Sequence, residues 1–126
     1  MIRYLLYIGI GGFAGSIARF LLSRWTNHLQ WMSVPLGTLL VNIAGSFLIG
    51  LLIGISEKSP VLTVELRMLL MVGLCGGFTT FSTFTGENLM LMRNGQFLSL
   101  FLYTGMSILM GFTAVYFGYL SSKLMG

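Results

Sequence analysis

The sequence predicts an all-α membrane protein in which four helices cross the bilayer and the third helix is broken. Hydrophobic residues make up 56% of the 126 residues and charged residues only 8%, whereas about 25% of an ordinary globular domain is charged. Such a chain cannot cover a water-facing surface, and its mean hydropathy of +0.90 agrees with this. Within one apolar stretch, the run GGFTTFSTFTGEN from Gly76 to Asn88 is polar and contains a glycine pair. We therefore expect one integral membrane domain over residues 1–126, with an irregular segment inside it.

Four segments have the roughly 20 mostly apolar residues that a helix needs to cross about 30 Å of hydrocarbon. They are Tyr4 to Arg24, Leu36 to Ile55, Glu65 to Met92 and Phe97 to Leu120. The connections are short, and RNGQ after the third segment is typical of a tight turn centred on Asn94 and Gly95. The first segment has the pattern of a signal peptide, with Arg3 ahead of an apolar run. Because three more spans follow it, we interpret it as a retained helix.

The placement of basic residues predicts that the chain inserts in both orientations. Four spans put both termini and the second connection on one side, with Arg3, Lys58, Arg67 and Lys123. The other side receives Arg19, Arg24 and Arg93. Because the two sides differ by only one basic residue, the positive-inside rule predicts no clear preference for either orientation, unless other signals fix the orientation. Two oppositely oriented copies would form an antiparallel homodimer with a closed two-fold interface, which resembles the inverted repeats of transporters.

Small and polar residues follow one face of three of the spans. Residues four apart share a helix face. In the second span this row is Thr38, Asn42, Ser46, Gly50 and Gly54. The first span has Gly11, Gly15 and Arg19, with Gly12 and Ser16 alongside, and the fourth has Tyr103, Ser107 and Gly111. Such rows let helices approach closely in membranes. Each of these spans is therefore expected to present one face to another helix or to a pore.

The third span is too long to be one straight helix. Its 28 residues would extend about 42 Å at 1.5 Å per residue, so we expect a break at Gly76 and Gly77. Freed carbonyls at the end of a half-helix suit a small cation. Beyond the break, helical spacing places Phe81 and Phe84 on one face, continuing to Asn88. The neighbouring face carries Thr80, Thr83 and Glu87.

This arrangement favours an anion pathway. An aromatic ring has a positive edge, so two phenylalanines that present their edges would favour an anion without trapping it. Hydroxyl groups can replace hydration water at several weak sites, as conduction requires. The amide of Asn42 either links helices or donates its NH₂ group to a passing anion. The alternative for any single phenylalanine is plain packing against lipid or protein, because the chain contains ten of them.

Three motifs resemble those of the CrcB/Fluc family of fluoride ion channels: GGFTTFSTF, GTLLVNIAGSF (Gly37 to Phe47) and GGFAGSIARF (Gly11 to Phe20). The resemblance covers the whole chain. It implies a dual-topology antiparallel homodimer with two pores in the bacterial cell membrane. It also implies passive, selective export of fluoride, which confers fluoride resistance.

The resemblance also implies roles for individual residues. Phe81 and Phe84 correspond to the rings along the pores and Asn42 to the pore amide. Thr80, Ser82, Thr83 and Glu87 correspond to a polar track, to which Tyr103 and Ser107 contribute by their helix face. Arg19 is either a positive vestibule that attracts anions or an anchor that reaches the membrane surface. A structural sodium ion at the dimer interface would be held by the backbone carbonyls of Gly76 and Thr79.

Other classes of protein agree less well with the sequence. A proton-coupled small multidrug transporter needs a carboxylate deep in a span, but Glu65 and Glu87 are near span ends. A non-conducting helical scaffold would explain the small-residue rows but not the polar run after the glycine pair. An enzyme needs catalytic groups within mutual reach, and the one histidine, His28, has no obvious partner. The single Cys75 excludes an intramolecular disulfide and is read as a small buried residue.

Overall fold

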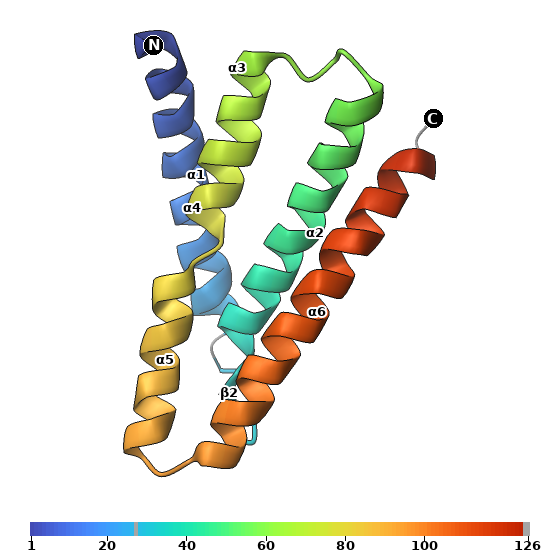
Figure 1. Cartoon of the computed structure of the whole chain (residues 1–126). Coiled ribbons are helices and arrows are strands. Elements are labelled where there is room, and N and C mark those ends of the chain that lie inside the picture. The colour runs from blue at the N-terminus through green and yellow to red at the C-terminus, as the bar shows by residue number, and fades with distance from the viewer. Residues whose placement is uncertain (27, 125–126) are drawn as a thin grey trace.

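The computed structural model describes residues 1–26 and 28–124, and within them four long helical segments run along one another (Figure 1). The elements are α1 (Ile2–Thr26), β1 (Gln30–Trp31), β2 (Val34–Pro35), α2 (Leu36–Lys58), α3 (Val64–Arg67), the π-helix η1 (Met68–Cys75), α4 (Gly76–Phe78), α5 (Phe81–Arg93) and α6 (Phe97–Leu124). Elements α3, η1, α4 and α5 together form the third span. All four segments are long and apolar enough to cross a membrane, which confirms the four predicted spans. The predicted domain also includes residues 27, 125 and 126, which lie outside the described residues.

The ends of the helices lie where a four-span protein requires them. The beginning of α1, the end of α6 and the beginning of α3 lie at one end of the molecule, and the turn between α5 and α6 lies at the other (Figure 1). That turn contains Gly95 with φ +74°, which confirms the tight turn expected at Asn94 and Gly95. Many large apolar side chains are exposed, including Phe13, Phe101 and Phe112. Their exposure agrees with lipid as the surrounding solvent.

The small-residue rows hold the helices together, as their spacing predicts. Helix α2 packs along α6, where glycine on each helix meets the backbone of the other. A Cβ atom at Gly50 would collide with the carbonyl of Val115, and one at Gly118 with the carbonyl of Phe47. On the other side, α1 packs against η1 and α4. Backbone approach of this kind is possible only without side chains at the contact.

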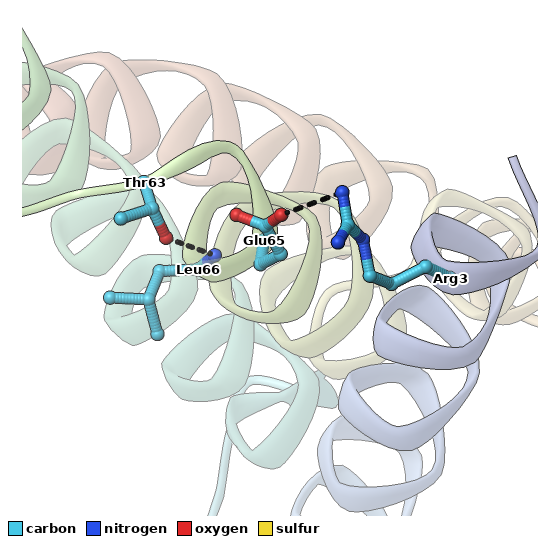
Figure 2. Close-up of polar contacts among 4 residues, drawn as sticks. All are labelled: Arg3, Thr63, Glu65 and Leu66. Carbon is cyan, nitrogen blue, oxygen red and sulfur yellow. Dashed lines mark hydrogen bonds and ion pairs between the residues drawn. The ribbon is translucent and has the colours of Figure 1, made fainter.

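The beginning of the third span is fixed by two polar contacts (Figure 2). Thr63 is the N-cap of α3, and its hydroxyl accepts a hydrogen bond from the backbone N–H of Leu66 at 3.2 Å. Glu65 in the first turn pairs with Arg3 at 3.3 Å. Because the Arg3 side chain is 68% exposed, this pair contributes little to stability. The contact nevertheless shows that α1 and α3 begin side by side.

The connection between α1 and α2 is a small hairpin, which the sequence analysis treated as a plain loop. Strands β1 and β2 pair in antiparallel register around Met32 and Ser33, which have positive φ angles of 53° and 66°. Side chains near the start of α6 hold this turn. The Ser99 hydroxyl donates to the Met32 carbonyl, and the Gln96 amide donates to the Ser33 hydroxyl at 2.9 Å. The hairpin therefore ties the end of α1 to the beginning of α6.

The expected break at Gly76 and Gly77 is wrong by three residues. Both glycines are helical, with φ −63° and ψ −37° at Gly76. The chain becomes extended at Thr79 (φ −91°, ψ 153°) and Thr80 (φ −150°, ψ 126°). Gly77 serves close packing instead, since a Cβ atom there would lie 2.7 Å from the carbonyl of Gly12 on α1. The threonines make the break because one of them caps the helix that follows.

Candidate functional site

An open groove of about 460 Å³ lies beside the break in the third span. Three spans contribute to its lining, and seven of the predicted site residues lie there. Asn42 comes from α2 and Ser107 from α6, and the third span contributes Gly76, Thr79, Thr80, Phe81 and Phe84. These residues are far apart in the sequence, so their meeting is a result of the helix packing. Five of the nine predicted pore residues therefore line the groove, and the other four do not: Ser82, Thr83, Glu87 and Tyr103.

Asn42 joins α2 to the break. Its Oδ1 atom accepts a hydrogen bond from the backbone N–H of Thr80 at 3.2 Å. The amide therefore does link two spans, as one of its two interpretations requires. Its oxygen is occupied by this contact, whereas an asparagine amide has two N–H donors in addition. Because Asn42 lines the groove, the NH₂ group is the part of this side chain that an anion could use.

The beginning of α5 gathers hydroxyl groups. Thr80 is the N-cap of this 13-residue helix, and its hydroxyl accepts from the backbone N–H of Thr83 at 3.3 Å. The same Oγ1 atom lies 3.1 Å from the Ser82 hydroxyl and 3.5 Å from the Thr83 hydroxyl. A helix N-terminus carries partial positive charge and unpaired N–H groups. Three hydroxyls at such a position make a favourable environment for an anion.

The two predicted phenylalanines form an aromatic row with Tyr103. The ring centroids of Phe81 and Phe84 are 5.9 Å apart, and those of Phe84 and Tyr103 are 5.0 Å apart, with tilted planes in both pairs. Phe81 is 77% exposed, whereas Phe84 is half-buried against the core around Tyr103. The two rings therefore share one face, as expected, but have different surroundings. Phe84 is held by its neighbours, and Phe81 faces outward.

Glu87, farther along α5, forms a partly buried polar pair with Tyr103 of α6. The Tyr103 hydroxyl donates to Glu87 Oε1 at 3.0 Å, and the tyrosine side chain is fully buried. Thr38, on α2, lies beside both side chains. The sequence analysis named Glu87 and Tyr103 separately and did not assign Thr38 to the site. Its position one helical turn before Asn42, in the same row, was the signal that could have included it.

Ser107 has unused hydrogen-bonding capacity. Its Oγ atom is buried and has no hydrogen-bond partner among residues 1–26 and 28–124. The residue lines the groove on the α6 side. A buried polar group without a partner costs free energy, so an unused hydroxyl at a groove suggests a ligand. The Oδ1 atom of Asn88, on the same helix face as Phe84, is also buried and has no hydrogen-bond partner within the described residues.

The end of α4 leaves backbone carbonyls for other partners. The last carbonyls of a helix have no intrahelical donors. That of Cys75 accepts from both the N–H and the hydroxyl of Thr79, at 3.0 and 2.9 Å. The carbonyl of Gly76 loses its usual α-helical donor, because the N–H of Thr80 turns to Asn42. Gly76 is exposed, and a Cβ atom there would meet nothing within 4 Å. Accessible backbone oxygens of this kind fit a hard cation such as sodium.

Arg19 lies against the break from the α1 side. Its Nε atom donates to the carbonyl of Gly77 at 3.1 Å, and the residue is half-buried. The guanidinium therefore contacts the end of the first half-helix, close to the middle of the third span. This contact places Arg19 at the break, where its positive charge lies at the end of a half-helix.

Comparison with known proteins gives consistent results. The family model described as "CrcB-like protein, Camphor Resistance (CrcB)" matches residues 6–119. The chain is 39% identical over 121 residues to the fluoride-specific ion channel FluC of Flavobacterium psychrophilum, covering 96% of this chain and 98% of that protein. It is 44% identical over 120 residues to the protein of the same name from Chlorobium phaeobacteroides, covering 95% and 93% of the two chains. The protein of that name from Leptospira interrogans is 41% identical over 109 residues, 86% of each chain.

Proposed function

This chain belongs to the CrcB-like family, which includes fluoride-specific ion channels, and we propose that two copies of it in opposite orientations conduct fluoride along the groove beside the break. It is a multi-pass protein of the cell membrane and a channel, not an enzyme. Fluoride would leave the cell passively, down its gradient, and this export would give fluoride resistance. The whole chain, residues 1–126, acts as one membrane domain.

The observation that supports this pathway best is the meeting of three kinds of anion-binding group in one groove. The amide of Asn42 and the hydroxyl of Ser107 offer N–H and O–H donors from two neighbouring spans. The N-terminus of α5 adds partial positive charge and the hydroxyl of Thr80, which lines the groove. The Ser82 and Thr83 hydroxyls, which are not part of the groove lining, lie 3.1 and 3.5 Å from the Thr80 hydroxyl. Phe81 and Phe84 add ring edges. Each of these groups binds an anion weakly, which allows the ion to leave again.

Glu87 and Tyr103 extend the polar track beyond the phenylalanines. The tyrosine hydroxyl is already donated to the glutamate, so the hydrogen bond joins α5 to α6 at this point. We expect it to position the wall of the pathway near Phe84, whose ring rests against Tyr103. Arg19 contributes positive potential from the α1 side of the break.

Exposed polar groups in the third span support the dimer. Ser82 and Thr83 are exposed in a segment that crosses the membrane, and Gly76 opens to free space. Hydrocarbon cannot satisfy such polar and backbone groups, so protein must cover them. A second copy related by a two-fold axis would cover the same surface on both partners. Opposite orientation of the copies would give two equivalent pathways.

The carbonyls of Gly76 and Thr79 are proposed to hold a structural sodium ion between the two copies. Both residues lie at the broken end of the first half-helix, where carbonyl groups lack helical donors. The ion would supply positive charge that offsets the partial negative C-terminal end of the first half-helix in each copy. Its role is to join the copies, and the fluoride ion does not bind to it in this proposal.

The function is tested by passive efflux from liposomes that contain the purified protein. Fluoride loss is measured with a fluoride-selective electrode, and chloride loss is then measured with a chloride electrode. Rapid loss of fluoride without loss of chloride, and without an applied proton gradient, is the expected result. Absence of fluoride flux from folded, reconstituted protein would disprove the channel, and proton-coupled drug exchange would then be assayed.

Asn42→Asp is expected to reduce fluoride flux roughly ten-fold or more while the protein stays folded. Aspartate keeps an oxygen for the N–H of Thr80, so the contact at 3.2 Å between α2 and the break can persist. It replaces the NH₂ donor by a negative charge, which repels an anion. Flux is measured from liposomes, with Asn94→Asp in the turn before α6 as the matched control. Normal flux in Asn42→Asp would remove this amide from the pathway.

Gly76→Val is expected to leave each copy folded but to weaken the dimer. A Cβ atom at this position would meet nothing within 4 Å in a single copy, whereas a valine side chain would occupy the proposed interface and the sodium site. Cross-linking in membranes and light scattering in detergent measure the dimer, with and without sodium. Gly9→Val is the control, because its Cβ atom also meets nothing within 4 Å. A Gly76→Val dimer that still depends on sodium would contradict the cation site.

A further inference from the structure

We propose that Arg19 is a positioning residue that fixes the end of the first half-helix at the break in the third span. By taking the carbonyl of Gly77, Arg19 holds the end of the first half-helix against α1, and it thereby fixes the orientation of the neighbouring Gly76 carbonyl, whose helical donor has turned to Asn42. The inference rests on the proposed function, because the break is the site at which that function occurs. It goes beyond a vestibule, in which only the positive charge of Arg19 would matter.

The contact between Arg19 and Gly77 replaces a hydrogen bond that a continuous helix would make within itself. In a continuous α-helix the carbonyl of Gly77 would accept from the N–H of Phe81, four residues later. Two extended residues intervene, and Phe81 begins the next helix. The Nε atom of Arg19 takes the vacant place at 3.1 Å, from a residue 58 positions earlier in the chain. The arginine therefore substitutes for the missing helical donor.

The contact divides the freed carbonyls among different partners. The carbonyl of Cys75 is used by Thr79, and that of Gly77 by Arg19. The carbonyl of Gly76 lies between them, and its usual donor has turned to Asn42. Without Arg19 the carbonyl of Gly77 would need another donor, and the end of the half-helix could rotate to find one. Asn42 therefore frees the carbonyl of Gly76, and Arg19 occupies the carbonyl of Gly77 and fixes the orientation of the helix end.

The packing of α1 against α4 fixes the distance between Arg19 and the carbonyl of Gly77. A Cβ atom at Gly77 would lie 2.7 Å from the carbonyl of Gly12 and 3.1 Å from the hydroxyl of Ser16. A Cβ atom at Gly15 would lie 2.9 Å from the N–H nitrogen of Phe78. The backbones of α1 and α4 are thus in close contact one turn before Arg19. The arginine side chain needs to span only a short, fixed distance.

Electrostatics also favour this contact. A charged side chain within a membrane span needs a partner. The C-terminal end of a helix carries partial negative charge, and α3, η1 and α4 form one continuous helical run that ends at Phe78. Lysine at this position would keep the charge, but a carbon atom would replace Nε, and its amine would extend one bond farther. A charge-only role and a positioning role therefore predict different results for Arg19→Lys.

The test compares Arg19→Lys and Arg19→Gln with the matched variants Arg24→Lys and Arg24→Gln on the same helix. Arg24 is exposed in the last turns of α1. Fluoride efflux is measured over a range of fluoride concentrations, which separates the maximal flux from the half-saturating concentration. The rate at which N-ethylmaleimide modifies Cys75 is measured in parallel. Cys75 is the only cysteine and is 4% exposed, so its reactivity reports on the break without any ion flux.

Both Arg19 variants are expected to lose maximal flux roughly ten-fold or more, with little change in the half-saturating concentration. Modification of Cys75 is expected to become several-fold faster in variants that still elute as the wild type does. The Arg24 variants should match the wild type in both measurements. Normal flux and normal Cys75 reactivity in Arg19→Lys would overturn the proposal, because charge alone would then suffice. A change in half-saturation without faster Cys75 modification in Arg19→Gln would overturn it as well. If the wild type itself shows no flux, the proposed function fails, while the Cys75 comparison still decides the role of Arg19.

Discussion

Phe84→Ile is expected to reduce fluoride flux roughly ten-fold or more, without loss of the folded protein. Phe84 is the central ring of the aromatic row, with centroids 5.9 Å from Phe81 and 5.0 Å from Tyr103. Isoleucine preserves most of the apolar volume but removes the ring edge that favours an anion. It also removes the surface on which Tyr103 rests. The wall of the groove would therefore lose both its electrostatic character and its shape.

Phe81→Ile isolates the first of these two effects. Phe81 is 77% exposed in a single copy, so its replacement disturbs little packing within that copy. We expect its flux to fall as well, since the ring lines the groove. Phe112→Ile on α6 is the control, because Phe112 is 74% exposed and lies outside the aromatic row. Efflux from liposomes measures all three, and wild-type flux in Phe84→Ile would exclude the rings from the mechanism.

Gly118→Val is expected to destabilise the fold itself, by about 3 kcal/mol. A Cβ atom at Gly118 would collide with the carbonyl of Phe47 and lie 3.0 Å from the N–H nitrogen of Leu51. Neither atom can move without bending α2. The contact between α2 and α6 is the most extensive between any two described elements, so a separation there would also displace Asn42 relative to Ser107.

Gly105→Val on the same helix is the matched control. Its Cβ atom would meet nothing within 4 Å, and the change in helix propensity is the same in both variants. Unfolding in a titration of denaturing detergent, followed by circular dichroism, measures the difference. Equal stability of the two variants would show that α2 and α6 do not rely on the glycine contact. If Gly118→Val loses both fluoride flux and stability, the loss of flux is attributed to the damaged fold and not to a role of Gly118 in the ion pathway.

Part of the groove lining was predictable because its polar and aromatic side chains have distinctive chemistry. Phe81, Phe84, Asn42 and Thr80 were expected along the ion pathway and line the groove, whereas Ser82, Thr83, Glu87 and Tyr103 were expected there and do not line it. The position of the break was predicted less well. Glycine is a common reason for a helix to end, but it is also the residue that lets two helices touch. A sequence does not distinguish these uses at Gly77, because the distinction depends on the carbonyl of Gly12 on another helix.

Contacts between distant residues were the other features that the sequence analysis missed. The pairing of Tyr103 with Glu87, beside Thr38, joins three spans. The contact of Arg19 with Gly77 joins two residues 58 positions apart. Each of these residues could also have served another common role in a membrane helix, such as facing lipid, anchoring the helix at the membrane surface or joining two helices. Only the helix packing selects one role for each.

The sequence by itself determined the solvent, the number of spans and the chemical groups available to an ion, because apolar length and side-chain chemistry are local properties of the chain. Its motifs were also sufficient to indicate the family. The tertiary structure decided where the third span breaks, which carbonyls that break leaves free, and which side chains meet in the groove. These features depend on distances between backbones of different helices. Such distances are set by glycine contacts along α1, α2 and α6 together, and no single segment contains them.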